Sequence, residues 1–242
     1  MKTKIIVVSS GTGGDGRTMV AAHHVYFGKE LGLKVAGVSI DRNNDLRQFL
    51  RPAGLAWFDG LCDELPSDLD LLVFDVCDGA KSVEVIRPDL WLLLVDDLNA
   101  ELAAAGLAPT LAGRVMRVRN YWHGYALPDD KRDLSLESTD VVLHRCNALA
   151  AATDAMRSVW SSKLGAYSAG ARIMSELVVE VFGHVGLLQS EDPPYEQRCG
   201  EAPQPFDTRE QQGIGRLAAF FDRFEASKHT QGKKGRGGQE RM

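Results

Sequence analysis

A chain of 242 residues is long enough for one α/β domain with an appendage, or at most two small domains. With 44% hydrophobic and 25% charged residues, its composition is that of an ordinary globular protein. The formal net charge of −5 argues against a protein that coats nucleic acid over its whole surface, although a local basic patch is compatible with it.

Neither a membrane span nor an export signal is evident in the sequence. No apolar run reaches the ~18–20 residues that cross a bilayer. The first residues lead directly into a short strand, without the apolar region of a signal peptide. The four cysteines are widely spaced and are expected to be reduced packing residues: Cys62, Cys77, Cys146 and Cys199. We therefore expect a cytoplasmic protein.

The first motif of the chain joins a strand to a helix through a glycine-rich turn. The strand-like run of residues 5–10, which begins with four apolar residues, stops at residues 11–16, and a helical pattern follows from Met19 to Leu31 with Gly32 as its stop. This order of elements points backbone N–H groups and a helix N-terminus at a bound phosphate. A glycine-rich turn without a ligand is the alternative interpretation.

Residues 11–18, GTGGDGRT, match the common phosphate-loop pattern G-x-x-x-x-G-K-[ST] at every position except the lysine, which is Arg17. Arg17 is placed to reach the terminal phosphates, and Thr18 to ligate Mg²⁺. The residues predicted to bind the nucleotide here are Gly11, Thr12, Gly13, Gly14, Asp15, Gly16, Arg17, Thr18 and Met19.

The doubled Gly13-Gly14 and the strand before it resemble the deviant Walker A loop of the ParA/MinD family of P-loop ATPases. In that family a second, signature lysine precedes the glycine pair, and Thr12 occupies its position here. Both characteristic lysines are therefore replaced, by Arg17 and Thr12.

Two later strands end in acids. Residues 34–41 form a predicted strand that ends at Asp41, and residues 70–79 contain an apolar strand with Asp75 near its end. The family resemblance implies that Asp41 orients the attacking water or the Mg²⁺ shell, and that Asp75 contacts the Mg²⁺ shell through water. Thr18, Asp41 and Asp75 are thus the predicted metal residues, with Asp41 also the predicted catalytic one. On local grounds alone, each acid is equally explained as a turn or strand-end residue.

Two further strands complete the predicted sheet. Residues 87–97 are almost continuously apolar, as in a strand covered by helices on both faces, and a helix over residues 100–107 leads to a fifth strand over residues 114–120. The resemblance implies that Asn120, at the end of this strand, hydrogen-bonds adenine, although Asn is also a common turn former. The expected fold is α/β, with a mostly parallel sheet flanked by helices as in P-loop NTPases.

The rest of the chain is predicted to be helical. Residues 138–140 supply an N-cap for a helix running past Leu143 to Trp160, and a second helix covers Ala169 to Phe182 with Gly183 as its stop. The predicted organisation is an α/β domain over residues 1–186, a polar linker over 187–212, an amphipathic helix over 213–227 and a disordered basic tail over 228–242.

The resemblance covers about residues 4–120 and implies a protein that binds ATP with Mg²⁺, forms a homodimer across the nucleotide and positions a cargo. Plasmid partition or intracellular positioning, with a protein partner, is the expected role. Because both lysines are replaced, we expect ATP hydrolysis to be weak or absent. A pseudo-ATPase adaptor is the main alternative. A flavodoxin-like or dinucleotide-binding enzyme fits less well, because the acids lie where Mg²⁺ chemistry needs them.

The C-terminal helix over residues 213–227 has an apolar face that is costly to expose to water. We expect it to pack within the protein or its dimer; binding to a partner or a membrane surface is the alternative, and the basic tail suits contact with anionic lipid or DNA.

Overall fold

The computed structural model describes residues 2–10, 16–40, 45–60, 66, 68–76, 87–96, 98–121, 141–144, 146–161 and 168–188. All of them fall within a compact unit that spans Met1–Ser190. The predicted linker from residue 189 onward, the amphipathic helix and the basic tail lie outside the described residues. In the described part, no helix is long and apolar enough to cross a membrane.

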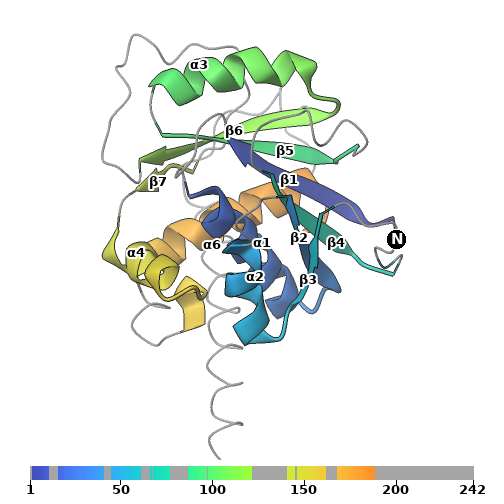
Figure 1. The fold of residues 1–242 in the computed structure, drawn as a ribbon, viewed down its shortest axis with the longest axis vertical. Helices are drawn as coiled ribbons and strands as arrows, with labels where there is room; N and C mark the ends of the chain where they lie inside the picture. The colour runs from blue at the N-terminus through green and yellow to red at the C-terminus, as the bar shows by residue number, and fades with distance from the viewer. Residues whose placement is uncertain are drawn as a thin grey trace, which may run out of the picture. The chain divides into compact units, whose positions relative to one another are not determined.

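A parallel sheet of seven strands in the order β3-β2-β4-β1-β5-β6-β7 forms the centre of the fold (Figure 1). The strands are β1 (Lys4–Ser10), β2 (Val35–Ile40), β3 (Ala56–Asp59), β4 (Leu71–Val76), β5 (Leu90–Val95), β6 (Arg114–Tyr121) and β7 (Leu143–His144). Each strand pairing in the described part is parallel. Parallel strands place all their carboxyl ends at one edge of a sheet, which is where open α/β sheets bind ligands.

Helices cover both faces of this sheet. In Figure 1, α3 lies on one face and α1, α2, α4 and α6 lie on the other. The α-helices are α1 (Arg17–Glu30), α2 (Asp45–Leu50), α3 (Leu98–Leu107), α4 (Asn147–Asp154) and α6 (Ala169–His184), and the short 3-10 helices are η1 (Arg51–Ala53), η3 (Ala108–Thr110) and η5 (Val159–Ser161).

The two-sided covering explains the sequence of the central strands. Each residue of β4 and of β5 is buried, and both strands are apolar throughout except for Asp75. A strand with helices on both faces needs such a continuous run, because neither face meets water. Each large side chain buried in this way stabilises the fold by about 1.5–3 kcal/mol. Asp75 is therefore a charged exception inside an apolar strand.

Aromatic contacts hold α1 against the C-terminal helices of the unit. The Phe27 ring lies 5.9 Å from that of Phe182 in α6 and 5.7 Å from that of Trp160 in η5, measured between centroids. The Trp160 indole N–H donates to the Ser175 hydroxyl of α6 over 3.1 Å. These contacts fix the direction of α1, and with it the position of its N-terminus at the carboxyl edge of the sheet.

The five strands predicted from the sequence are confirmed, but the structure adds two short ones. β3 is only four residues long and half exposed, so it lacks the apolar run by which the others were recognised. Its Trp57 ring lies 4.5 Å below the Arg47 guanidinium.

The predicted helix from residues 138–140 to Trp160 is wrong. Leu143 and His144 instead pair with the end of β6 as β7, and α4 begins only at Asn147 with Cys146 as its N-cap. The sequence pattern did not separate these elements, because short apolar runs are ambiguous between a strand and a helix. The second predicted helix is confirmed as α6, which ends one residue beyond Gly183.

Candidate functional site

The candidate site lies at the carboxyl edge of the sheet, where β1 ends and α1 begins. β1 is flanked by β4 and β5, and the chain leaves β1 toward β2 on one side but leaves β4 toward β5 on the other. This reversal is a topological switch point, the place where open α/β sheets bind their ligands.

Buried polar side chains converge on this edge. Successive residues of a strand point to opposite faces, and the positions that share the α1 face end in Ser10 on β1, Ser39 on β2, Asp75 on β4 and Asn120 on β6. All four are at most 3% exposed. Because buried polar groups are costly unless they are paired, their gathering at one edge marks a site rather than ordinary core.

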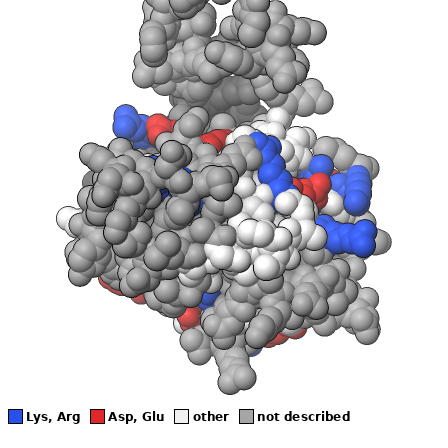
Figure 2. All heavy atoms as spheres, turned by 90° about the horizontal axis from the view of Figure 1, so that it is seen from above, with Lys and Arg blue, Asp and Glu red and all other residues white. Residues whose placement is uncertain are grey.

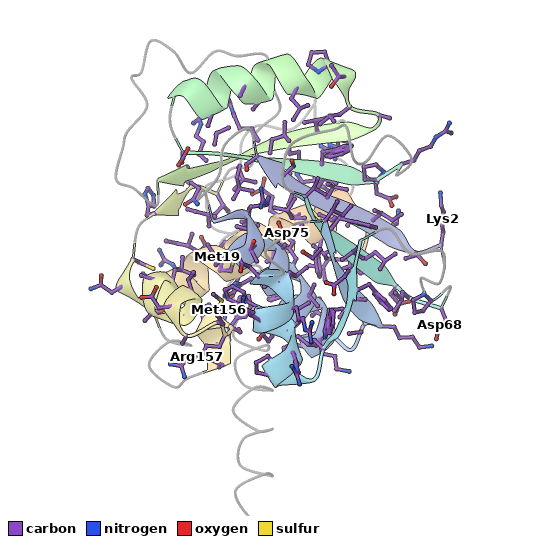
Figure 3. The ribbon with its side chains drawn as sticks, viewed as in Figure 1. Lys2, Met19, Asp68, Asp75, Met156 and Arg157 are labelled. Carbon is purple, nitrogen blue, oxygen red and sulfur yellow. The ribbon has the colours of Figure 1, made fainter. Side chains whose placement is uncertain are left out.

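Asp75 is bonded to the first turn of α1. The Arg17 Nε–H donates to Asp75 Oδ1 over 2.6 Å, and the Thr18 hydroxyl donates to Asp75 Oδ2 over 2.7 Å. The Arg17 side chain is 9% exposed and that of Asp75 only 1%, so the ion pair is buried. Arg17 Nη1 also reaches the Ser10 hydroxyl at 3.5 Å. Figure 3 shows Asp75 in the interior, near Met19 at the start of α1.

The start of α1 requires glycine. Gly16 is the N-cap and has a φ of +80°, a left-handed conformation that side chains other than glycine adopt only with strain. A Cβ at this position would also lie 2.8 Å from Asn120 Nδ2. Asn120 thus packs directly against the loop end.

The structure brings together five of the predicted site residues: Gly16, Arg17, Thr18, Asp75 and Asn120. Met19 follows them, but its side chain is buried core, so only its backbone N–H is available to a ligand. Residues 11–15 and Asp41, which the sequence also assigned to the site, lie outside the described residues.

Ser10 and Ser39 are members of the site that the sequence did not identify. Each is a buried serine at or next to the end of a strand, directly before the glycine loop in one case and opposite Asp75 in the other. The signal for Ser10 was its place immediately before Gly11.

The two histidines of α1 are structural. Both are fully buried, and burial lowers the pKa of each to about 4, so both are neutral at pH 7. His23 accepts a hydrogen bond from the Val159 N–H through Nε2 over 3.0 Å, while its Nδ1 lies 2.7 Å from the Met19 carbonyl oxygen and therefore carries the proton. His23 thereby ties η5 to α1 and, being neutral, adds no charge of its own near the site.

The described donor set does not fit Mg²⁺, the metal that the family resemblance implies. Mg²⁺ is held in proteins mainly by carboxylate oxygen and water. Here both oxygens of Asp75 accept from α1, and one of the donors is a guanidinium whose charge already balances the carboxylate. Among the described residues, moreover, no group of three or more His, Cys, Asp or Glu side chains is placed to hold a metal ion.

Solved structures show the same arrangement of elements. The chain is similar to a ParA family ATPase from Chlorobium tepidum TLS, with 13% identity, a TM-score of 0.60, and coverage of 74% of this chain and 99% of that one. It is similar to a chain of the MinC:MinD cell division protein complex from Aquifex aeolicus, with 16% identity, a TM-score of 0.57, and coverage of 79% and 98%. It is also similar to the septum site-determining protein MinD from Pyrococcus horikoshii OT3 in complex with Mg-ADP, with 18% identity, a TM-score of 0.56, and coverage of 76% and 98%.

The sequence matches no protein-family model and no curated protein. At these low identities the structural similarity establishes the fold. The chain has a ParA/MinD-like fold.

Proposed function

We propose that the chain binds ATP through residues 11–19 and acts in the cytoplasm as a ParA/MinD-like positioning protein, in plasmid partition or in the placing of another cargo. In this proposal nucleotide binding drives formation of a homodimer that engages a protein partner, and ATP is hydrolysed slowly or not at all.

The start of α1 is the observation that carries the proposal. The helix begins at a left-handed glycine, at the switch point of the sheet, and its first turn contains a cation and no acid. The first N–H groups of a helix have no partner within the helix and carry partial positive charge, so a phosphate is stabilised there. One structural neighbour is described as a complex with Mg-ADP, which supports a nucleotide as the ligand.

Weak hydrolysis follows from the side chains that replace the two lysines. Catalysis of phosphoryl transfer depends on charges that stabilise the transferring phosphoryl group. Thr12 offers no charge at the signature position, and the Arg17 guanidinium is engaged with Asp75.

Calorimetry of ADP and ATP binding, with a turnover assay on the same preparation, tests this function. We expect binding without robust multiple turnover, and we expect Arg17→Ala to weaken binding more than Thr12→Ala, because Arg17 is the only basic side chain of the loop. Robust turnover by the isolated protein would contradict weak hydrolysis. Failure to bind either nucleotide would contradict the proposal itself.

Dimerisation is tested by light scattering with and without ATP. We expect the mass to double with ATP and to be that of a monomer without nucleotide. An unchanged mass would remove the dimer from the proposal.

A partner protein is in keeping with the MinC:MinD complex among the structural neighbours. On the face shown in Figure 2, described Lys and Arg side chains lie near Asp and Glu beside an area of uncharged described residues. Such a mixture of charges suits a protein partner better than nucleic acid.

A nucleotide-free adaptor is the second candidate function, and the Arg17–Asp75 pair favours it. This pair balances the charge of Asp75 without any ligand. Absence of nucleotide binding by a folded protein that still binds its partner would select this candidate.

A further inference from the structure

Arg17 occupies the position that is lysine in the common phosphate loop, and its side chain is held on Asp75. Asp75 is the acid expected to contact the shell of Mg²⁺ through water. The side chain expected to face phosphate and the one expected to face the metal are thus bonded to each other, over 2.6 Å and away from solvent.

The charges of this pair disfavour a neighbouring dication. A carboxylate attracts Mg²⁺ through its negative charge, and here a fixed positive charge already lies at hydrogen-bond distance from that carboxylate. A hydrated Mg²⁺ ion held by Asp75 would have to lie beside the guanidinium or displace it. Displacement is costly because a buried charge left without its partner loses both its hydration and its ion pair.

We propose that the Arg17 guanidinium takes the place of the divalent cation against Asp75, so that the site binds its nucleotide without Mg²⁺. This inference rests on the proposed function, and it specifies the chemical form of the ligand: a free nucleoside di- or triphosphate rather than its magnesium complex.

The side-chain chemistry explains why arginine, and not lysine, performs this role. The atom that donates to Asp75 is Nε, which lies within the arginine side chain. Lysine carries a methylene at the same distance along its chain, and its one charged group lies an atom further out. Arg17 therefore bonds Asp75 from within its stem while the rest of its planar fork extends toward Ser10, at 3.5 Å from Nη1.

Nucleotide affinities with and without Mg²⁺ test the inference. For the wild-type chain, we expect the Kd of ADP and of ATP to be the same in Mg²⁺ and in EDTA within about threefold. Arg17→Lys is the matched variant, because it keeps the charge but removes the Nε–H. We expect it to bind at least about tenfold more tightly in Mg²⁺ than in EDTA, because Asp75 is released to the metal shell. Tenfold tighter binding by the wild-type chain in Mg²⁺ would overturn the inference while leaving nucleotide binding intact.

A second measurement is independent of nucleotide. In the nuclear magnetic resonance spectrum of the full chain, the Arg17 Nε–H should give a signal protected from exchange, assigned by its loss in Arg17→Lys. We expect millimolar Mg²⁺ alone to leave it unchanged. Loss of protection on adding Mg²⁺ would show that the metal displaces Arg17, and the inference would fail whether or not the chain binds nucleotide. A signal that stays protected in Mg²⁺, in a chain that binds no nucleotide, would refute the proposed function and the part of the inference that concerns nucleotide. It would still confirm that Arg17 keeps the metal away from Asp75.

Discussion

Asp75 accepts hydrogen bonds from the side chains of Arg17 and Thr18 in α1, and the charged Arg17 side chain is buried together with Asp75. Taking both charges out of water is expensive, and a buried ion pair adds little net stability over apolar residues of the same size. Removal of one partner alone is different, because it leaves the other charge buried without compensation.

We predict that Asp75→Asn and Arg17→Met each lower the free energy of unfolding by about 3–5 kcal/mol, and that the double variant loses clearly less than the sum. Urea unfolding at neutral pH measures the cycle. The exposed pair Lys34–Asp68, joined over 2.9 Å, is the control, since its disruption should change stability little. Additive losses at Arg17 and Asp75 would mean that the two side chains do not depend on each other.

Gly16 combines a backbone requirement with a steric one. We predict that Gly16→Ala costs about 1–2 kcal/mol of stability from its left-handed φ of +80°. The same change should weaken nucleotide binding, because the new methyl group would lie 2.8 Å from Asn120 Nδ2. Asn120→Ser in the same chain should relieve the steric part and leave the backbone part. Equal stability of wild type and Gly16→Ala in thermal unfolding would contradict this description of the loop end.

Helix α1 is the element on which the site depends, because its N-cap is Gly16 and its first turn contains Arg17 and Thr18. Its later residues pack against η5 and α6. His23 joins it to η5, and the His24 ring lies 6.0 Å from that of Phe182 in α6. These neutral histidines stabilise the helix only while they remain unprotonated.

We predict that the free energy of unfolding falls as the pH is lowered from 6.5 to 4. Burial lowers the pKa of His23 and His24 from 6.5 to about 4, so in this window the unfolded chain binds protons that the folded chain does not. The loss is on the order of several kcal/mol for the two together. The loss of stability is complete below about pH 4, the pKa of the histidines in the folded chain. Above pH 6.5 the stabilisation from both neutral histidines is fully present. Urea unfolding across this range measures it.

The variants His24→Phe and His23→Phe separate the two contributions. Each should remove about half of the pH dependence. In the described part His24 Nε2 has no hydrogen-bond partner, whereas His23 Nε2 accepts from the Val159 N–H. His23→Phe should therefore also destabilise the protein at pH 7, by leaving a buried N–H unpaired. An unchanged pH profile in both variants would show that other groups set the acid sensitivity.

At the scale of the whole molecule, the described residues belong to the unit Met1–Ser190, and the site lies entirely within it. The predicted amphipathic helix and basic tail lie outside the described residues. We predict that deletion of residues 213–242 leaves nucleotide binding by calorimetry unchanged and weakens association with a protein partner, anionic vesicles or DNA at low salt. An insoluble or unfolded truncated chain would show instead that the helix belongs to the core.

Much of the fold was predictable because its signals are local. Five strands are apolar runs bounded by turn residues: β1, β2, β4, β5 and β6. Helices and strands also space their apolar residues at periods of 3.6 and two residues, which can be recognised within a short stretch of sequence. β3 and β7 were not predictable, because such short strands are defined by the partner strand with which they pair rather than by their own residues.

For the site, the sequence by itself determined the strand that ends at Ser10 and the helix that starts at Arg17, and it identified Arg17, Thr18, Asp75 and Asn120 as candidates. Only the tertiary structure decided how they are joined. Arg17 and Asp75 lie 58 residues apart, and the sequence assigned one to phosphate and the other to metal. Their pairing arises because β4 lies next to β1 in the sheet, which brings Asp75 beneath the first turn of α1 in a place without water. There a carboxylate must find a donor, and the guanidinium of Arg17 supplies one.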